Sequence, residues 1–174
     1  MAKRISISDD YLKLDDIVRY KEDVEKAIKF YFKYGNFPLL TKEEILNRQK
    51  EILKELELNI IFMLLSSIEA WIRVDYEYRV RKRLKDELSR ELRKIDKRLN
   101  KPYQISIEKL CDIYKKYCTR KSLFSELKSA FKLRHWLAHG RYWKLKIGKK
   151  YDFSEVYQLA ISIYNLLIVK SISK

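Results

Sequence analysis

Both histidines of the chain lie in one short segment, and this segment is where the sequence could carry out proton chemistry. His135 and His139 are four residues apart, Arg134 precedes the first of them, and Gly140 follows the second. Histidine gains and loses protons near neutral pH, with a reference pKa of about 6.5. An arginine can hold a phosphate and offset the charge that develops on it. A lone histidine is more often structural, but this grouping favours a catalytic site.

Arg134 falls on the apolar side of the helix that we expect to carry this segment. A guanidinium that faces a core needs a partner, because a buried charge without one is very unfavourable. Glu69 is misplaced in the same way, since apolar residues flank it at helical spacing. The simplest interpretation is that Glu69 pairs with Arg134. The alternative is a pair within one helix, between Glu69 and Arg73 at i+4.

The elements that must position these residues are predicted to be helices. With three glycines and two prolines in 174 residues, the chain has few breaks. We expect helices over about 14–34, 106–118 and 122–139, and a last one from a Ser154 cap to about residue 170. Thr41 and Glu44 form a capping box. After it, helical periodicity continues to residue 100, as one very long helix or as two with a bend that the pattern does not locate.

The predicted fold is therefore all-α. We expect a single domain over residues 1–174, a bundle of about five helices with a long protruding helix pair. Residues 79–101, roughly, would be a basic helical extension. For the wider run of residues 73–101, a solvated helix laced with salt bridges is the plainer interpretation. Residues 141–151 should form a loop or a small hairpin.

The charge indicates a polyanionic partner. Lys and Arg number 39 against 24 Asp and Glu, a net charge of +15, although such an excess can also serve solubility alone. Residues 131–150 contain seven Lys and Arg and no acid. Cations interleaved with aromatic rings suit single-stranded RNA. The residues that we expect to contact RNA are Arg141, Tyr142, Trp143, Lys144 and Lys146. Trp136 could equally pack into the core or a dimer.

Several other classes of protein are not favoured. The longest apolar stretch, residues 58–68, is shorter than the ~20 residues of a membrane span, and the N-terminus does not resemble a signal peptide. We expect a cytoplasmic protein that does not bind membranes, with Cys111 and Cys118 as buried, reduced thiols. His135 and His139 have zinc-ligand spacing, but no third ligand is evident, so we expect neither a metal nor a cofactor.

The segment from Arg134 to Gly140 resembles the R-x(4–6)-H motif of HEPN domains, in which a polar residue usually follows the arginine. Ser66 to Arg73 is similar to the acidic-residue helix of that family, and the final helix has a counterpart there. The resemblance covers about residues 56–170, apart from a variable stretch near 79–102. It implies metal-independent cleavage of RNA at the seam of a homodimer, where two motifs face each other.

The resemblance also implies a role for each residue. His139 would be the general acid or base, and Arg134 would hold the scissile phosphate. His135 would orient one of these two, and Glu69 would support Arg134. Arg134 and His139 are five residues apart, about 140° of rotation on a regular helix, which favours a second subunit completing the site. A toxin or antiphage effector is the setting that the resemblance suggests, with an antitoxin protein as a further partner.

Two other functions stay open at this stage. One keeps the fold without catalysis, as a helical RNA-binding module in which the motif arginine and histidine are structural. The other is a helical protein-interaction module, which would dimerise without salt-sensitive binding of RNA.

Overall fold

The computed structural model describes residues 12–99 and 105–167, and these form an all-α bundle, as predicted. No strand occurs among them. The elements in chain order are α1 (Leu14–Tyr31), a 3-10 turn η1 (Tyr34–Asn36), α2 (Lys42–Arg81), α3 (Glu87–Asp96), α4 (Ile107–Tyr117), α5 (Lys121–Ala138) and α6 (Phe153–Leu166).

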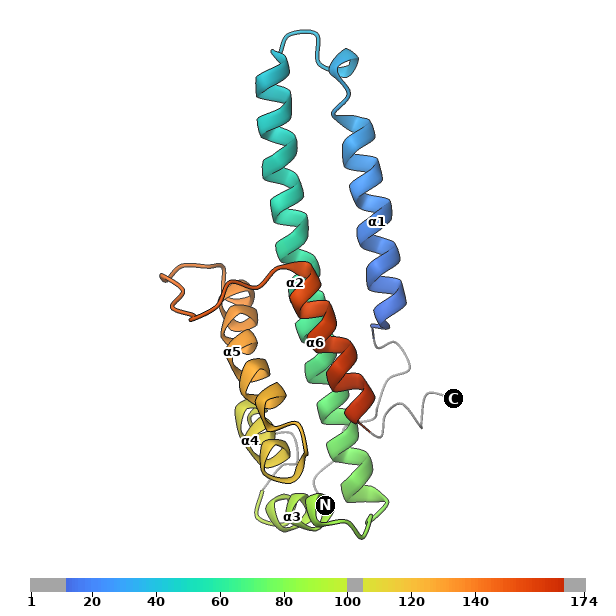
Figure 1. The fold of residues 1–174 in the computed structure, drawn as a ribbon, viewed down its shortest axis with the longest axis vertical. Coiled ribbons are helices and arrows are strands. Elements are labelled where there is room, and N and C mark those ends of the chain that lie inside the picture. The colour runs from blue at the N-terminus through green and yellow to red at the C-terminus, as the bar shows by residue number, and fades with distance from the viewer. Residues whose placement is uncertain (1–11, 100–104, 168–174) are drawn as a thin grey trace.

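The 40-residue helix α2 organises the molecule, because most other helices pack along it (Figure 1). α1 lies beside its N-terminal half, α5 and α6 beside its middle, and α3 at its C-terminal end, while α4 packs mainly on α5. α1 and the first half of α2 extend beyond the rest as a hairpin, which is the protruding helix pair of this fold.

The core forms where three helices bring apolar faces together around the second half of α2. Many of the side chains with less than 2% of their surface exposed belong to α2, α5 and α6, where they recur at helical spacing. They include Ile60, Leu64, Ile68 and Ile72 of α2, Phe124, Leu127 and Ala130 of α5, and Val156, Ala160 and Ile163 of α6. The helices that carry the candidate site are thus fixed to each other by close packing.

Local sequence sets most helix ends. The Thr41 hydroxyl accepts a hydrogen bond from the Glu44 N–H at 3.2 Å, and the Glu44 carboxylate accepts one from the Thr41 N–H at 2.8 Å, so the predicted capping box is confirmed. α1 ends at Tyr31, about three residues earlier than expected, where Phe32 is buried and its ring stacks on that of Phe37.

The start of the last helix was predicted wrongly. Asp152, not Ser154, is the N-cap, and its carboxylate accepts a hydrogen bond from the Glu155 N–H at 2.9 Å. The Phe153 N–H donates to the Glu57 carboxylate of α2 at 3.1 Å, which joins the helix start to the bundle. α6 ends at Leu166, and its expected end near residue 170 lies outside the described residues.

The long helical pattern of residues 42–100 is two helices, with the break at residues 82–86. Arg83 adopts a left-handed φ of 50°, and the Asp86 carboxylate caps α3 by accepting from the Ser89 N–H at 3.0 Å. Leu88 and Leu92 are buried, so the described part of the expected extension, residues 79–99, folds onto the body. Burial of these leucines outweighs the charge of the segment.

A buried polar network fixes α3 and α4 to the end of α2. Asp75 is fully buried and receives hydrogen bonds from Arg79, at 2.5 Å, and from the Tyr114 hydroxyl, at 2.6 Å. Arg79 also contacts Asp86 and the Ser89 hydroxyl, each at 3.2 Å. Burial, followed by the charge of Asp75, raises the pKa of Tyr114 well above its ordinary value, so the phenol stays protonated and donates.

The cysteines are free thiols, as expected, with Cys111 buried and Cys118 half-buried. Burial raises the pKa of Cys111 to about 12, which keeps that thiol protonated at neutral pH. Among the residues that the structure describes, no helix combines the length and the apolar character needed to span a bilayer.

Candidate active site

The candidate site lies at the C-terminal end of α5, where the chain reverses. His139 is the last residue before a left-handed Gly140 with a φ of 73°. The Arg141 N–H donates to the Trp136 carbonyl at 3.0 Å, and the Gly140 N–H donates to the Leu137 carbonyl at 3.4 Å. This is a Schellman motif, which satisfies the last carbonyls of the helix. The predicted helix end is therefore confirmed.

The segment after α5 returns across this end as a loop. The Trp136 indole N–H donates to the Trp143 carbonyl at 2.7 Å and fixes the start of the loop. From Trp143 to Ile147, half-buried residues alternate with the exposed Lys144 and Lys146. Of the two forms expected for residues 141–151, the structure has the loop without paired strands.

The two histidines lie against each other on the exposed side of α5. Their ring centroids are 4.3 Å apart, with an angle of 59° between the rings. The Trp143 ring lies 5.6 Å from His135 and 6.3 Å from His139, so an aromatic wall borders the pair. Both histidines are exposed to solvent. The arrangement offers two proton-transfer groups side by side, open to a ligand.

Arg134 points to the other side of α5 and pairs with Glu69 of α2. Its Nη2 lies 3.0 Å from Glu69 Oε2, and its guanidinium carbon lies 5.9 Å from the centre of the Phe62 ring. Glu69 Oε2 and Arg134 Nε are buried and have no well-aligned hydrogen bond among the described residues. The contact is therefore an ion pair whose geometry falls short of a good hydrogen bond. The predicted pairing is confirmed.

Glu69 also binds Arg73, so the two alternatives for its partner occur together. Arg73 approaches Glu69 Oε1 with Nε at 2.9 Å and with Nη2 at 2.8 Å. Arg73 Nη1 donates in addition to the Ile105 carbonyl at 3.2 Å. Each carboxylate oxygen of Glu69 thus faces one guanidinium, and a single acid holds two cations.

The separation of Arg134 from His139 follows from their spacing of five residues. Within the described residues, no hydrogen bond or ion pair joins Arg134 to His135 or His139. The arginine faces α2, and the histidines face outward with Trp143. A single chain therefore supplies the groups that the sequence predicted but does not bring them into mutual contact.

The predicted RNA-binding residues occupy different environments. Arg141, with a φ of 60°, makes a two-pronged pair with Glu55 of α2, with contacts at 2.9 and 2.8 Å. That hydrogen bonding lowers the pKa of Glu55. Tyr142 is 83% exposed, and Trp143 is half-buried beside the histidines. Sequence reasoning missed Glu55, and no periodic signal points to it because it lies 86 residues away.

Sequence reasoning also missed three lysines that share a surface hollow with His135, namely Lys115, Lys128 and Lys132. A signal was present, because Lys128, Lys132 and His135 follow the i, i+4, i+7 spacing of one helix face. Metal ligation by the histidines finds no further support within residues 12–99 and 105–167, where no group of three or more His, Cys, Asp or Glu could hold an ion. A third ligand would have to come from elsewhere.

Comparison of the chain with protein-family models, with curated proteins and with solved structures found no significant match.

Proposed function

We propose that this protein is a metal-independent endoribonuclease that cleaves single-stranded RNA at the C-terminal end of α5. The observation that carries the proposal is the contact between two exposed histidine rings, 4.3 Å apart, beside a basic loop. Two neighbouring imidazoles meet the main requirement of RNA transphosphorylation, which is proton transfer to and from oxygen near neutral pH.

The chain contains the groups that the proposed cleavage step needs. An imidazole takes the proton of the ribose 2′-hydroxyl, the 2′-oxygen attacks the adjacent phosphorus, and the bond to the 5′-oxygen breaks. The imidazolium so formed gives its proton to the leaving 5′-oxygen, so the products are a 2′,3′-cyclic phosphate and a 5′-hydroxyl, and the imidazole is regenerated. We assign the proton transfer to His139, with His135 orienting it through the ring contact. A placed general acid or base contributes about 10²–10⁴-fold.

Arg134 would stabilise the phosphate, and Glu69 would position Arg134. The side chain of Arg134 keeps 31% of its surface exposed despite the ion pair, so a ligand can approach it. Because Arg134 and the histidines face different sides of α5, we propose that a two-fold homodimer completes the site. Preorganised positive charge of this kind accounts for a large share of the rate in many enzymes.

The proposal includes membership of the HEPN family and a role as a toxin or antiphage effector with an antitoxin partner. The order of the helices supports it, since an acidic residue of α2 holds the motif arginine of α5 and a final helix packs beside both. A coding neighbourhood that contains a small nucleotidyltransferase-like reading frame would support the toxin role.

The first experiment measures cleavage of single-stranded RNA in EDTA and identifies the product ends. We expect 2′,3′-cyclic phosphate or 3′-phosphate ends, and loss of most activity in His139→Ala and in Arg134→Ala. Arg48→Ala, which removes an exposed charge from the protruding part of α2, is the matched control and should cleave normally. A His139→Ala variant that cuts at the wild-type rate would refute the catalytic assignment. Binding without cleavage would point to the RNA-binding module instead.

The second experiment tests the dimer by mixing inactive subunits. If each site uses Arg134 of one subunit and His139 of the other, a mixed dimer of Arg134→Ala and His139→Ala keeps one intact site. Random exchange should then restore about a quarter of wild-type activity, because half of the dimers are mixed and each has one of two sites. No recovery from mixtures that demonstrably exchange subunits would exclude a shared site.

A further inference from the structure

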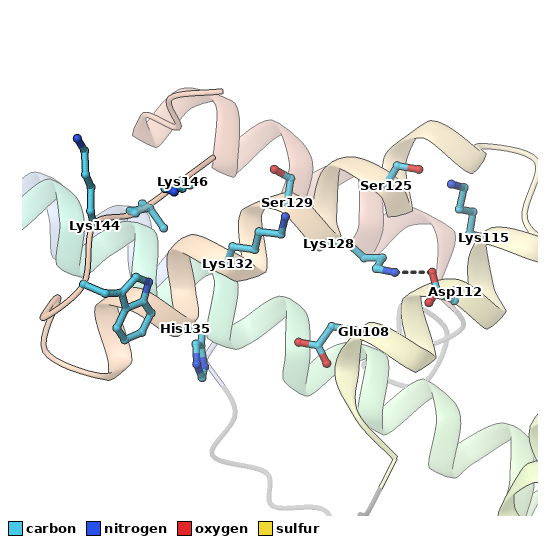
Figure 2. A pocket seen from close by; sticks show the side chains of 12 residues that line it. Glu108, Asp112, Lys115, Ser125, Lys128, Ser129, Lys132, His135, Lys144 and Lys146 are labelled. Atoms are coloured by element: carbon cyan, nitrogen blue, oxygen red, sulfur yellow. Dashed lines mark hydrogen bonds and ion pairs between the residues drawn. The ribbon is translucent and has the colours of Figure 1, made fainter. Parts of the chain in front are cut away.

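A groove leads away from the histidines between α4, α5 and the loop that follows α5 (Figure 2). Its volume is about 720 Å³. The side chains that line it are Glu108, Asp112 and Lys115 of α4, Ser125, Lys128, Ser129, Lys132 and His135 of α5, and Trp143, Lys144, Leu145 and Lys146 of the loop. We call this hollow the lysine groove.

The lysines of the groove differ in their partners. Lys128 forms an ion pair with Asp112 at 2.7 Å, and Figure 2 shows this pair bridging the two helices. The other four, Lys115, Lys132, Lys144 and Lys146, are exposed and make no ion pair within the described residues. Glu108 is the other acid that lines the groove, and it makes no ion pair within the described residues. The groove therefore carries an excess of positive charge that the described part of the chain does not neutralise.

The charges are spread along a line, not gathered at a point. Ser125, Lys128, Ser129, Lys132 and His135 recur along one face of α5, and the ten-residue step from first to last spans about 15 Å. Figure 2 shows Lys144 and Lys146 at the end near His135 and Lys115 at the opposite end. A single small anion cannot contact amines so far apart, whereas a chain of phosphates can.

The structure assigns the lysine groove to the phosphodiester backbone of a single nucleic-acid strand, which runs from the histidine pair along α5 toward Lys115. Trp143 lies in the same wall, next to both histidine rings, and offers a base a surface on which to stack. This inference deepens the proposed function, since it rests on the scissile bond lying at the histidines. Binding in the groove can nevertheless be measured without cleavage.

The test uses a 2′-O-methyl oligouridine, which cannot be cleaved because its 2′-oxygen is blocked. The groove variant replaces Lys115, Lys132, Lys144 and Lys146 with alanine. Four lost phosphate contacts should weaken binding and reduce the log–log dependence of affinity on salt by about 2.8, at about 0.7 per contact on a single strand. Thermal melts should show that the variant is folded.

The matched control removes the same charge from the protruding hairpin, by replacing the exposed Lys13, Lys26, Lys29 and Lys33 with alanine. It should leave the salt dependence close to that of the wild type. Equal losses in the two variants would mean that binding follows net charge alone, and unchanged binding in the groove variant would overturn the assignment. Displacement of the oligouridine by polyglutamate as readily as by RNA of equal charge would show a general acidic-ligand site and would also overturn it.

A substitution at Glu108 tests the same assignment through an increase in affinity, where the groove variant should show a decrease. Glu108→Gln removes the remaining acid from the wall and should tighten oligouridine binding at low salt. Glu22→Gln makes the same change of charge on the exposed face of α1 and should not. If both variants tighten binding equally, the strand does not lie beside Glu108.

Cleavage kinetics separate failure of the groove from failure of the proposed function. A dinucleotide at the histidine pair is too short to extend along the groove to Lys115, so the groove variant should lose much less activity on it than on a long RNA. For a long RNA the same variant should show a raised KM with kcat little changed. If the wild type binds the oligouridine through the groove yet cleaves neither substrate, the catalytic proposal fails while the binding assignment stands.

Discussion

Removing the Glu69 carboxylate should destabilise the protein and weaken its activity together, because that one acid holds two arginines. The Glu69 side chain is 14% exposed, and its two oxygens face Arg73 and Arg134. Glu69→Ala leaves both guanidiniums beside the core without their anion. Glu69→Gln is the milder change, since it keeps the shape of the side chain and removes only the charge.

The expected loss of stability in Glu69→Ala lies between the values for an exposed and for a fully buried ion pair. An exposed ion pair contributes about 0–1 kcal/mol, whereas removing one member of a fully buried pair costs about 3–5 kcal/mol. Glu69 is nearly buried, but Arg73 and Arg134 keep 35% and 31% of their side-chain surfaces in water. We therefore expect Glu69→Ala to lower the free energy of unfolding by about 2–3 kcal/mol.

The structure also changes the expectation for Arg73. If Glu69 paired with Arg134 alone, Arg73→Ala would matter little. Arg73 instead contacts Glu69 and donates to the Ile105 carbonyl. A hydrogen bond to a charged group contributes about 1.5–3 kcal/mol, and solvent reduces this because the Arg73 side chain is 35% exposed, so its loss should cost about 1–2 kcal/mol.

Urea unfolding followed by circular dichroism gives the free energies of unfolding, and a double-mutant cycle of Glu69→Ala with Arg134→Ala isolates their interaction. We expect a coupling of at least about 0.5 kcal/mol. Wild-type stability in Glu69→Ala, or additive single changes in the cycle, would refute the claim that this acid holds Arg134.

Four further outcomes follow from the structure. Asp75→Ala should lower the free energy of unfolding by about 3–5 kcal/mol in a urea titration, because it removes the closer of the two carboxylates that pair with the buried Arg79 guanidinium and the acceptor of the buried Tyr114 hydroxyl. Cys111, whose pKa is raised to about 12 by burial, should resist alkylation from pH 7 to 10 in the native protein and react at once in denaturant; native labelling would contradict its burial. Thr41→Ala should cost about 1 kcal/mol by removing the cap of α2, with Thr41→Ser restoring it. Gly140→Ala should cost about 1 kcal/mol at a φ of 73°, which a shift in melting temperature would report.

The sequence predicted the parts of the fold that depend on local chemistry. Thr41 caps α2, as its spacing from Glu44 indicated, and Gly140 ends α5 in a left-handed conformation. The helix expected from about residue 106 begins at Ile107, with Ser106 as its cap. The pairing of Glu69 with Arg134 was predictable for a different reason. Two opposite charges on apolar faces have few ways to avoid an unfavourable burial except by meeting.

The buried position of Asp75 could have been predicted in the same way as that of Glu69. Asp75 lies seven residues after Ile68 and three after Ile72, on the buried face of α2, and so is misplaced in the same sense as Glu69. Its partner Tyr114 is 39 residues away on α4 and carries no charge to reveal it. Misplaced charges can thus be recognised from a pattern, whereas neutral partners require the fold.

The start of α6 and the break between α2 and α3 could not be predicted, because the sequence fits two local structures about equally well at each place. Asp152 and Ser154 are both good cap residues, and the contact of Phe153 with Glu57 on another helix accompanies the choice of Asp152. The break at residues 82–86 contains neither glycine nor proline. Packing of Leu88 and Leu92 onto the body determines it, and a periodic pattern cannot distinguish that packing from a straight continuation.

The ion pairs around α5 determine where the excess positive charge of the chain, +15 in total, has no acidic partner. Three acids near the candidate site each take one cation: Glu55 takes Arg141, Asp112 takes Lys128, and Glu126 takes Lys149. Arg141, which was predicted to contact RNA, is therefore not among the unpaired cations. Four exposed lysines that make no such pair among the described residues, Lys115, Lys132, Lys144 and Lys146, line the groove beside His135. Because a strand binds where positive charge lacks a counterion, this pattern favours the groove over Arg141, which pairs with Glu55, and over Lys94 of α3, which pairs with Glu91.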